Sequence, residues 1–333
     1  MRVAVLGAGS WGTTLAALLA SNGHDVRLWS YTADIVETIV RTRQNPDYLP
    51  GLILPESIRV TDDLHRAADG AEMFVLATPS QFLRSVAMRL KDIDPGNAIF
   101  VNVAKGIETV SLLRMSEVVG EVFPSVDPSR YAVLSGPSHA EEVAVQKATS
   151  VVVASLSQDT CQTVQSTFMT QTFRVYSSND VVGVELGGSL KNVIAIGAGI
   201  CDGGQLGDNT KAALITRGIA EMRRLGVALG ARPETFAGLS GLGDLIVTTM
   251  SRHSRNRFVG HEIGTGRSLT DILSGMKMVA EGVETTRSAH ALAERTGVEM
   301  PITHMMYRIL FEAKDTAEAT MELMTRQARD ETW

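Results

Sequence analysis

The sequence predicts an α/β domain with a doubly wound, mainly parallel sheet, followed by an all-α domain. Three observations carry this prediction. Short apolar runs alternate with helical patterns through the first half of the 333 residues, the runs are apolar almost throughout, and strand-like runs nearly vanish after about residue 180. Strands that are buried on both faces of a parallel sheet have this continuous apolar character, because neither face meets water.

Six runs are expected as strands, and helical patterns fill the segments between them. The expected strands lie at 2–7, 25–30, 73–78, 98–103, 131–136 and 150–155, and the helices between them include 12–22, 33–43 and 80–91. Longer helical patterns follow at 209–230 and 316–331. The polar stretch SSND, which ends at Asp180, is typical of a helix N-cap. We therefore predict one domain over 1–180 and a helical domain over 181–333.

The composition is that of an ordinary globular protein, with 44% hydrophobic and 20% charged residues. A net charge of −6 argues against nucleic acid as a partner, so an anionic ligand must meet local positive charge. Two cysteines make no disulfide framework and the histidines lack metal-ligand spacing, so we expect no metal. The most apolar stretch contains Glu185, Lys191 and Asn192, and the N-terminal apolar run is too short for a signal peptide. We expect a cytoplasmic protein without membrane insertion.

The first motif, GAGSWG at 7–12, follows the first expected strand and opens a helical run. Gly7 permits a tight turn, Gly9 lets the backbone approach a pyrophosphate, and Gly12 lets helix and strand pack closely. The helix N-terminus offers unpaired N–H groups to the phosphates. This context predicts a Rossmann dinucleotide-binding domain over 1–180, with Ser10 and Trp11 against the cofactor. A purely structural glycine turn is the alternative.

The second expected strand leaves the choice between NAD and NADP open. An NAD site normally has a carboxylate at the end of this strand for the ribose 2′-hydroxyl, but the sequence there is Trp-Ser-Tyr-Thr, ending at Thr32. An arginine for a 2′-phosphate is missing as well. Hydroxyl groups at the start of the next helix would hold such a phosphate weakly, so we expect NADP or the use of both cofactors.

Lys191 is the main candidate for chemistry in the second half. It lies in GGSLKNVIAIGAG, where its neighbours on a helix face would be the small residues Gly187, Gly188 and Ala195 together with Ile194. We expect them to leave a groove in which a small ligand reaches the amine. Burial would lower the pKa of this lysine and fit it for proton transfer near neutral pH. The alternative is a lysine whose amine reaches out to water.

Four further segments carry candidate polar groups. Asp244, within an apolar stretch, is placed to pair with Lys191 and orient it, and SRHSRNR around Arg255 is a plausible anion site. Lys105 follows an expected strand and could meet a phosphate or a carbonyl, although a solvated surface lysine is the simpler interpretation. Gly136 begins a tight turn, and His139 beyond it is a rival acid–base residue.

In their order along the chain, these motifs resemble those of bacterial NAD(P)-dependent glycerol-3-phosphate dehydrogenases. The likeness runs from Met1 to about residue 330, and its most specific part is LKNVIAIGAG with a downstream SRNR. It implies the reversible reduction of dihydroxyacetone phosphate by NAD(P)H to sn-glycerol 3-phosphate, which supplies phospholipid synthesis. The implied partner is thus a small phosphorylated three-carbon molecule, and the helical domain suits a homodimer.

The resemblance also implies roles for individual residues, with Lys191 as the proton donor to the substrate carbonyl. It places the substrate among Lys105, Gly136, Ser138, Lys191, Asp244, Ser254, Arg255 and Asn256. It places the cofactor beside Ser10, Trp11, Tyr31, Tyr48, Lys105, Ala140, Arg255, Val279 and Glu281. Many family members carry a basic residue where Tyr31 stands, which leaves recognition of a 2′-phosphate open.

Two other functions are compatible with the predicted architecture. A β-hydroxyacid or sugar-acid dehydrogenase would need a clamp for a carboxylate instead of a phosphate. A dinucleotide-sensing regulator with a helical dimerisation domain would need no catalytic group, and it leaves Lys191 and the segment around Arg255 unexplained.

Overall fold

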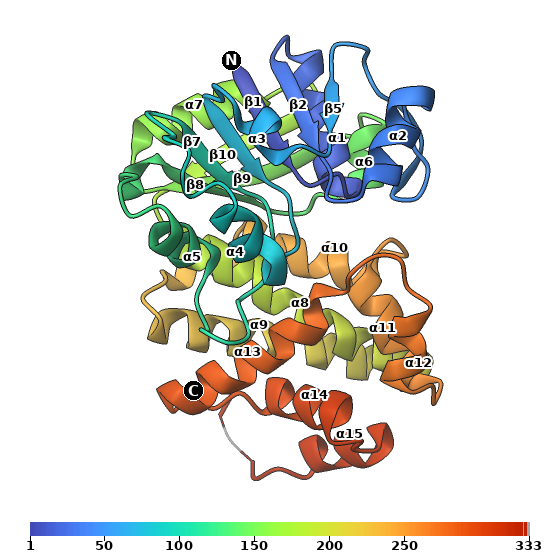
Figure 1. Ribbon diagram of the computed structural model, residues 1–333. Coiled ribbons are helices and arrows are strands. Elements are labelled where there is room, and N and C mark those ends of the chain that lie inside the picture. The colour runs from blue at the N-terminus through green and yellow to red at the C-terminus, as the bar shows by residue number, and fades with distance from the viewer. Residues whose placement is uncertain (329, 332–333) are drawn as a thin grey trace.

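The N-terminal half is built on an eight-stranded sheet. Figure 1 shows the computed structural model, which describes residues 1–328 and 330–331. The strand order is β10-β9-β8-β7-β6-β1-β2-β5, and each neighbouring pair is parallel except β8 and β9. The strands are β1 Arg2–Leu6, β2 Asp25–Trp29, β5 Arg59–Thr61, β6 Met73–Leu76, β7 Ile99–Asn102, β8 Tyr131–Ser135, β9 Thr149–Ser155 and β10 Phe173–Ser178. A hairpin of β3 Gln44–Asn45 and β4 Leu49–Ile53 stands apart. The predicted fold class is confirmed.

Two strands of the large sheet were not expected from the sequence. β10 lies at one edge and alternates buried and exposed residues, so it lacks the continuous apolar character that identified the others. β5 lies at the opposite edge and has only three residues, none of them fully buried. Edge strands meet water on more sides than central ones, so their apolar signal is weaker.

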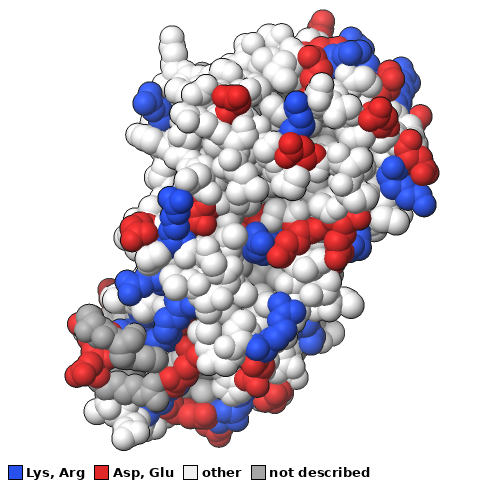
Figure 2. All heavy atoms as spheres, turned by 90° about the vertical axis from the view of Figure 1, so that its left-hand side faces the viewer, with Lys and Arg blue, Asp and Glu red and all other residues white. Residues whose placement is uncertain are grey.

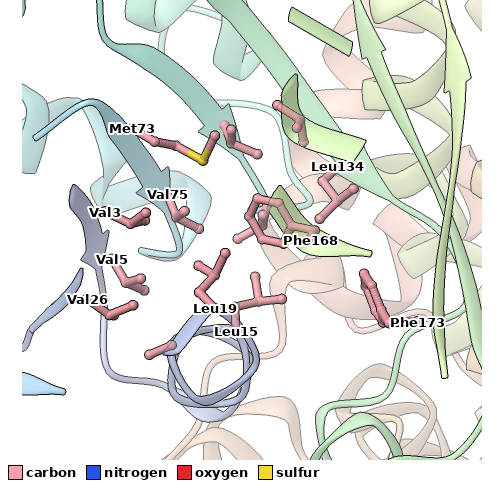
Figure 3. Close-up of a cluster of buried hydrophobic side chains, with 14 of the residues drawn as sticks. Val3, Val5, Leu15, Leu19, Val26, Met73, Val75, Leu134, Phe168 and Phe173 are labelled. Carbon is pink, nitrogen blue, oxygen red and sulfur yellow. The ribbon is translucent and has the colours of Figure 1, made fainter. Parts of the chain in front are cut away.

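Helices cover both faces of the sheet and bury separate apolar clusters against it. On one face, Leu15 and Leu19 of α1 pack against Val3, Val5 and other strand residues, as Figure 3 shows. Phe74 and Phe100 stack in the cluster on the other face, with ring centroids 5.0 Å apart. The covering helices are α1 Ser10–Ser21, α2 Ala33–Thr42, α3 Leu64–Ala68, α4 Ser80–Met88, α5 Met115–Val122, α6 Ala140–Ala144 and α7 Gln158–Phe168.

The C-terminal half is helical and is organised around α8, Val181–Gly203. By length and composition α8 could cross a membrane, but 94% of its most apolar window is buried inside the fold, so core packing accounts for its apolarity. The surrounding helices are α9 Asp208–Ala228, α10 Asp244–Met250, α11 Arg255–Gly264, α12 Leu269–Ser274, α13 Glu281–Thr296, α14 Pro301–Phe311 and α15 Thr316–Met324. The last of these ends well before residue 331, where the sequence pattern placed its end.

Helices α8 and α11 pack closely against each other, and this contact depends on glycine. A Cβ added at Gly260 would lie 1.9 Å from the carbonyl oxygen of Ile196, and one at Gly199 would lie 2.1 Å from that of Arg257. The two backbones therefore touch, which no side chain larger than hydrogen would permit. This contact holds the start of α11 against the part of α8 that carries Lys191 and Asn192.

Charged side chains do not form a field of one sign on the face drawn in Figure 2, where acidic and basic residues are interspersed. This agrees with the modest net charge of −6. This face therefore does not attract an anionic ligand as a whole, and such a ligand has to meet particular positive groups in a site.

Candidate active site

A cavity of about 770 Å³ lies between the carboxyl edge of the sheet and the helical half. In open α/β sheets ligands bind at this edge. Most of the residues singled out from the sequence line this cavity: Gly7, Gly9, Ser10, Trp11, Tyr31, Tyr48, Lys105, Ser138, Ala140, Lys191, Asp244, Ser254, Arg255, Asn256, Val279 and Glu281. Gly12 and Gly136 do not line it.

The glycine loop between β1 and α1 has the form that a pyrophosphate requires. Gly7 has a φ of +128°, and a Cβ there would lie 2.7 Å from the oxygen of Ala77. A Cβ at Gly12 would lie 1.9 Å from the oxygen of Gly7, so this glycine serves the packing of helix on strand. At Gly9 a Cβ would meet nothing within 4 Å, which leaves the backbone open to the cavity. The buried Nε1 of Trp11 has no hydrogen-bond partner among the described residues, so a polar ligand group could accept its hydrogen.

Lys191 is buried, with 5% of its surface exposed, so its amine does not reach bulk water. Its Nζ donates a hydrogen bond to Thr248 Oγ1 at 2.6 Å and lies 2.8 Å from Asp244 Oδ1. The expected groove beside it is absent, because protein atoms fill the space next to the small residues. A Cβ at Gly187 would lie 2.8 Å from the oxygen of Ser240, and one at Gly188 would lie 2.6 Å from Ser135 Oγ. The small size of these glycines lets neighbouring backbone and side-chain atoms pack against α8. A ligand would reach the amine of Lys191 through the cavity instead.

Asp244 lies between two lysines at the base of the cavity. Its Oδ2 accepts a hydrogen bond from Lys105 Nζ at 2.7 Å, and Lys105 also donates to the carbonyl oxygen of Gly136 at 3.0 Å. Burial lowers the pKa of Lys191 to about 8, while the charge of Asp244 opposes this shift. Burial by itself would raise the pKa of Asp244, but the two ammonium groups outweigh it and hold that pKa below its usual value. Lys191 can therefore exchange a proton close to neutral pH.

The start of α11 presents the SRNR segment to the cavity. Ser254 caps the helix, because its Oγ accepts a hydrogen bond from the amide of Arg257 at 3.2 Å. Arg255 is exposed at the cavity wall, and the described residues show no ion pair for it. Arg257 instead turns away to Asp202, with 2.7 Å between Nε and Oδ2. Of these two arginines, only Arg255 is placed to meet an anion in the cavity.

Asn256 and Asn192 form a buried amide pair that joins three elements. Asn256 Nδ2 donates to Asn192 Oδ1 at 2.9 Å, and its Oδ1 accepts from the amide of Gly282 at 2.9 Å. Asn192 Nδ2 in turn donates to the carbonyl oxygen of Lys105 at 3.2 Å. The pair thus ties the loop that carries Lys105, and the start of α11 that carries Arg255, to α8.

Glu281 holds the start of α4 and the loop that carries Lys105. Its carboxylate accepts hydrogen bonds from the amides of Ser80 at 2.7 Å and Lys105 at 3.2 Å. Burial raises the pKa of this carboxyl, and the two backbone donors and the charge of Arg255 oppose that shift.

Tyr31 stands at the rim of the cavity and is 80% exposed. Ser138 Oγ is bonded to the oxygen of Gly136 at 3.0 Å.

The cavity wall also carries Thr248 and His253, which were not identified from the sequence, beside His139, which was. Thr248 bonds both Lys191 and Asp244, and its position four residues after Asp244 on one helix was the signal that could have identified it. His139 and His253 also line the cavity, with ring centroids 5.9 Å apart. Burial and the nearby charge of Lys191 lower the pKa of His139, so its imidazole is neutral at pH 7. Within residues 1–328 and 330–331, no three metal-ligating side chains cluster.

Comparison with known proteins identifies relatives over the whole chain. Residues 2–161 and 180–321 match the family models described as NAD-dependent glycerol-3-phosphate dehydrogenase N-terminus and C-terminus. A protein of Chlorobium phaeobacteroides named glycerol-3-phosphate dehydrogenase, NAD(P)+, is 53% identical over 99% of both chains. A protein of the same name from Geobacter sulfurreducens is 52% identical over 100% of this chain and 99% of its own. The crystal structure of glycerol-3-phosphate dehydrogenase from Coxiella burnetii superposes with a TM-score of 0.93 at 40% identity, covering 97% of this chain and 98% of that one.

Proposed function

The chain belongs to the NAD-dependent glycerol-3-phosphate dehydrogenase family, and from that membership we propose how its cavity carries out the reaction. It is an oxidoreductase that interconverts dihydroxyacetone phosphate and sn-glycerol 3-phosphate with NAD(P)H, a step that supplies glycerophospholipid synthesis. The observation that carries the assignment of roles is the buried amine of Lys191, bonded to Asp244 and Thr248 inside the cavity.

The glycine loop fits the dinucleotide on two observations. Gly9 leaves open space above the N-terminus of α1, and the indole N–H of Trp11 has no partner in the part of the chain that the structure describes. The amides at the start of α1 and the positive end of its dipole would hold the pyrophosphate. When it is bound, the nicotinamide supplies the hydride for reduction.

Lys191 donates the proton that the reduced carbonyl oxygen requires. Asp244 and Thr248 hold the ammonium group in place, since both lie within 2.8 Å of Nζ. With a pKa of about 8, Lys191 is mainly charged at pH 7 and still acidic enough to release its proton. Lys105 adds a second positive charge beside the position at which negative charge develops. In the direction of oxidation, the neutral amine of Lys191 accepts the proton.

Arg255 anchors the phosphate of the substrate at the start of α11. An arginine can bind phosphate through two parallel hydrogen bonds, and the helix terminus adds its unpaired amides. Asn256 positions this segment through Asn192 and Gly282. Anchoring the phosphate makes proton transfer from Lys191 effectively intramolecular, which lowers the entropic part of the barrier.

An initial-rate assay tests this function against its nearest alternative. The purified protein is given dihydroxyacetone phosphate with NADH or with NADPH. In parallel it is given a set of 3-hydroxy acids with the oxidised form of each cofactor. We expect turnover of the phosphorylated ketone and none of the hydroxy acids. Activity on hydroxy acids alone would establish a β-hydroxyacid dehydrogenase, and cofactor binding without any turnover would favour a regulator. We further propose that the protein acts in the cytoplasm and that it forms a homodimer. A sedimentation measurement of its mass in solution would test the homodimer.

A further inference from the structure

The cavity wall beyond the glycine loop is organised by Trp29, the last residue of β2. Trp29 is 1% exposed, and its Nε1 donates to the oxygen of Asp62 at 2.9 Å, which fixes the ring. The ring of Tyr31 meets it edge-on with centroids 6.4 Å apart. The guanidinium carbon of Arg89 lies 5.6 Å from the indole centroid. The indole thus holds Arg89, the residue that follows α4, beside the end of β2.

The end of β2 is where a Rossmann domain reads the adenosine ribose. Ser30, Thr32 and Arg89 all line the cavity. The carboxylates that line it are Glu141, Asp244 and Glu281, and all three come from other elements, so none stands on the connection between β2 and α2. A site specialised for NAD would offer a carboxylate to the ribose 2′-hydroxyl, and this end of the cavity offers a cation and two hydroxyls instead.

Of the other cations that line the cavity, Arg255 lies at the start of α11, where it is assigned to the phosphate of the substrate, and the three lysines are engaged with carboxylates. Lys277 forms an ion pair with Asp47 at 2.7 Å, and Lys105 and Lys191 share Asp244. Arg89, in contrast, has no ion pair in the described part of the chain, and its neighbour is the indole of Trp29. Its guanidinium therefore remains available to an anionic group.

The hydroxyls at this end are also arranged toward the cavity. Ser30 is buried, and its Oγ accepts a hydrogen bond from the amide of Thr32 at 3.3 Å, which leaves its own proton for another acceptor. The hydroxyl of Thr32 does not cap α2. Asp34 in the first turn of α2 disfavours an anion held by that helix terminus alone, so a second phosphate there needs a side-chain cation.

We propose that Arg89, with the hydroxyls of Ser30 and Thr32, binds the 2′-phosphate of NADPH and takes the place of the basic residue that this chain lacks at Tyr31. The inference rests on the proposed cofactor site. An arginine suits the task because its planar guanidinium binds phosphate through two hydrogen bonds, and the indole behind it restricts its freedom. The enzyme accordingly accepts both cofactors, and Arg89 sets its affinity for the phosphorylated one.

Binding measurements without substrate test this proposal independently of turnover. The affinities of NADPH and NADH are determined by fluorescence titration for the wild type, Arg89→Gln and Lys91→Gln. Lys91 is a matched control, because it is an exposed cation two residues further along that does not line the cavity. Loss of a charge-assisted hydrogen bond to phosphate corresponds to about a ten- to hundredfold weaker affinity, which we expect for NADPH with Arg89→Gln. We expect NADH to weaken less than about threefold, and Arg89→Lys to recover part of the NADPH affinity.

Competition by fragments of the cofactor separates the 2′-phosphate from the adenine. 2′-AMP should compete with NADPH more strongly than 5′-AMP does in the wild type, and this preference should disappear in Arg89→Gln. Equal losses for both cofactors would mean that Arg89 contacts the adenine, and an unaltered NADPH affinity would mean that it contacts neither. Either result, or a wild type that does not bind NADPH, would overturn the proposal. NADH binding with no reduction of dihydroxyacetone phosphate would instead count against the proposed function.

Discussion

Replacement of Asp244 by asparagine should move the pH range in which the enzyme reduces its substrate. The carboxylate lies 2.8 Å from Lys191 Nζ, and at an effective dielectric constant of about 20 two unit charges at that separation attract by about 6 kcal/mol. A partner this close typically changes a pKa by about 1–3 units after desolvation is included, so the pKa of Lys191 should fall from about 8 to between about 5 and 7. The neighbouring charge of Lys105, no longer balanced, acts in the same direction.

The direction of the effect follows from the protonation state that each reaction uses. Reduction needs the ammonium form of Lys191, so kcat/KM for dihydroxyacetone phosphate falls as the pH rises through the pKa, near pH 8 in the wild type. In Asp244→Asn this fall should begin about 1–3 pH units lower, and oxidation of glycerol 3-phosphate should extend to lower pH by the same amount.

Initial rates measured from pH 5.5 to 9.5 in both directions provide the assay. Asp202→Asn is a matched control, because Asp202 also bridges two cations, Lys211 and Arg257, but does not line the cavity. Its profile should coincide with that of the wild type. If the alkaline limb of Asp244→Asn stayed where it is in the wild type, the coupling of this carboxylate to the proton donor would be wrong.

Three further changes probe separate parts of the account. Arg255→Ala should raise KM for dihydroxyacetone phosphate about ten- to hundredfold with a smaller effect on kcat, and an unaltered response to substrate concentration would contradict its role as the phosphate anchor. Gly260→Ala should lower the free energy of unfolding by about 1–3 kcal/mol in urea titrations, because the new Cβ would lie 1.9 Å from the oxygen of Ile196; a neutral result would show that the two helices separate easily. Burial raises the pKa of Glu221 to about 7, so the unfolded chain releases its proton at lower pH than the folded one. Stability should therefore fall by up to about 3 kcal/mol between pH 4.5 and 7, and Glu221→Gln should flatten this slope.

The central architecture was readable from the sequence because it rests on buried, regular elements. Strands such as Met73–Leu76 are apolar on both faces, and a short continuous apolar run between turn residues is typical of a strand at the centre of a parallel sheet. The direction of β9 could not be predicted, because the composition of an apolar run does not indicate in which direction the strand runs within the sheet. Only its pairing shows that β9 is antiparallel to β8. The edge strands β5 and β10 were not predicted from the sequence, because they are less buried and their residues are less uniformly apolar.

Within the site, the sequence identified charged residues more readily than their neutral partners. A lysine at position 191 and an aspartate at position 244 stand out against apolar surroundings, because burying a charge demands a partner. Thr248 does not stand out in this way, since a threonine on a helix is ordinary, and only its position four residues after Asp244 indicates a contact with that carboxylate. The role of small residues was misjudged at Gly187 and Gly188, where the space serves packing between elements instead of a ligand. Sequence shows that a close approach occurs but not which group approaches.

The most direct test of the account is the replacement of Lys191 by alanine, followed by measurement of NADH binding and of turnover on the same preparation. If the buried amine is the proton donor, NADH affinity should stay within about threefold of the wild type while kcat falls by at least about 10²–10⁴-fold, the usual contribution of a positioned acid. A variant that binds NADH normally and keeps its turnover number would contradict the assignment.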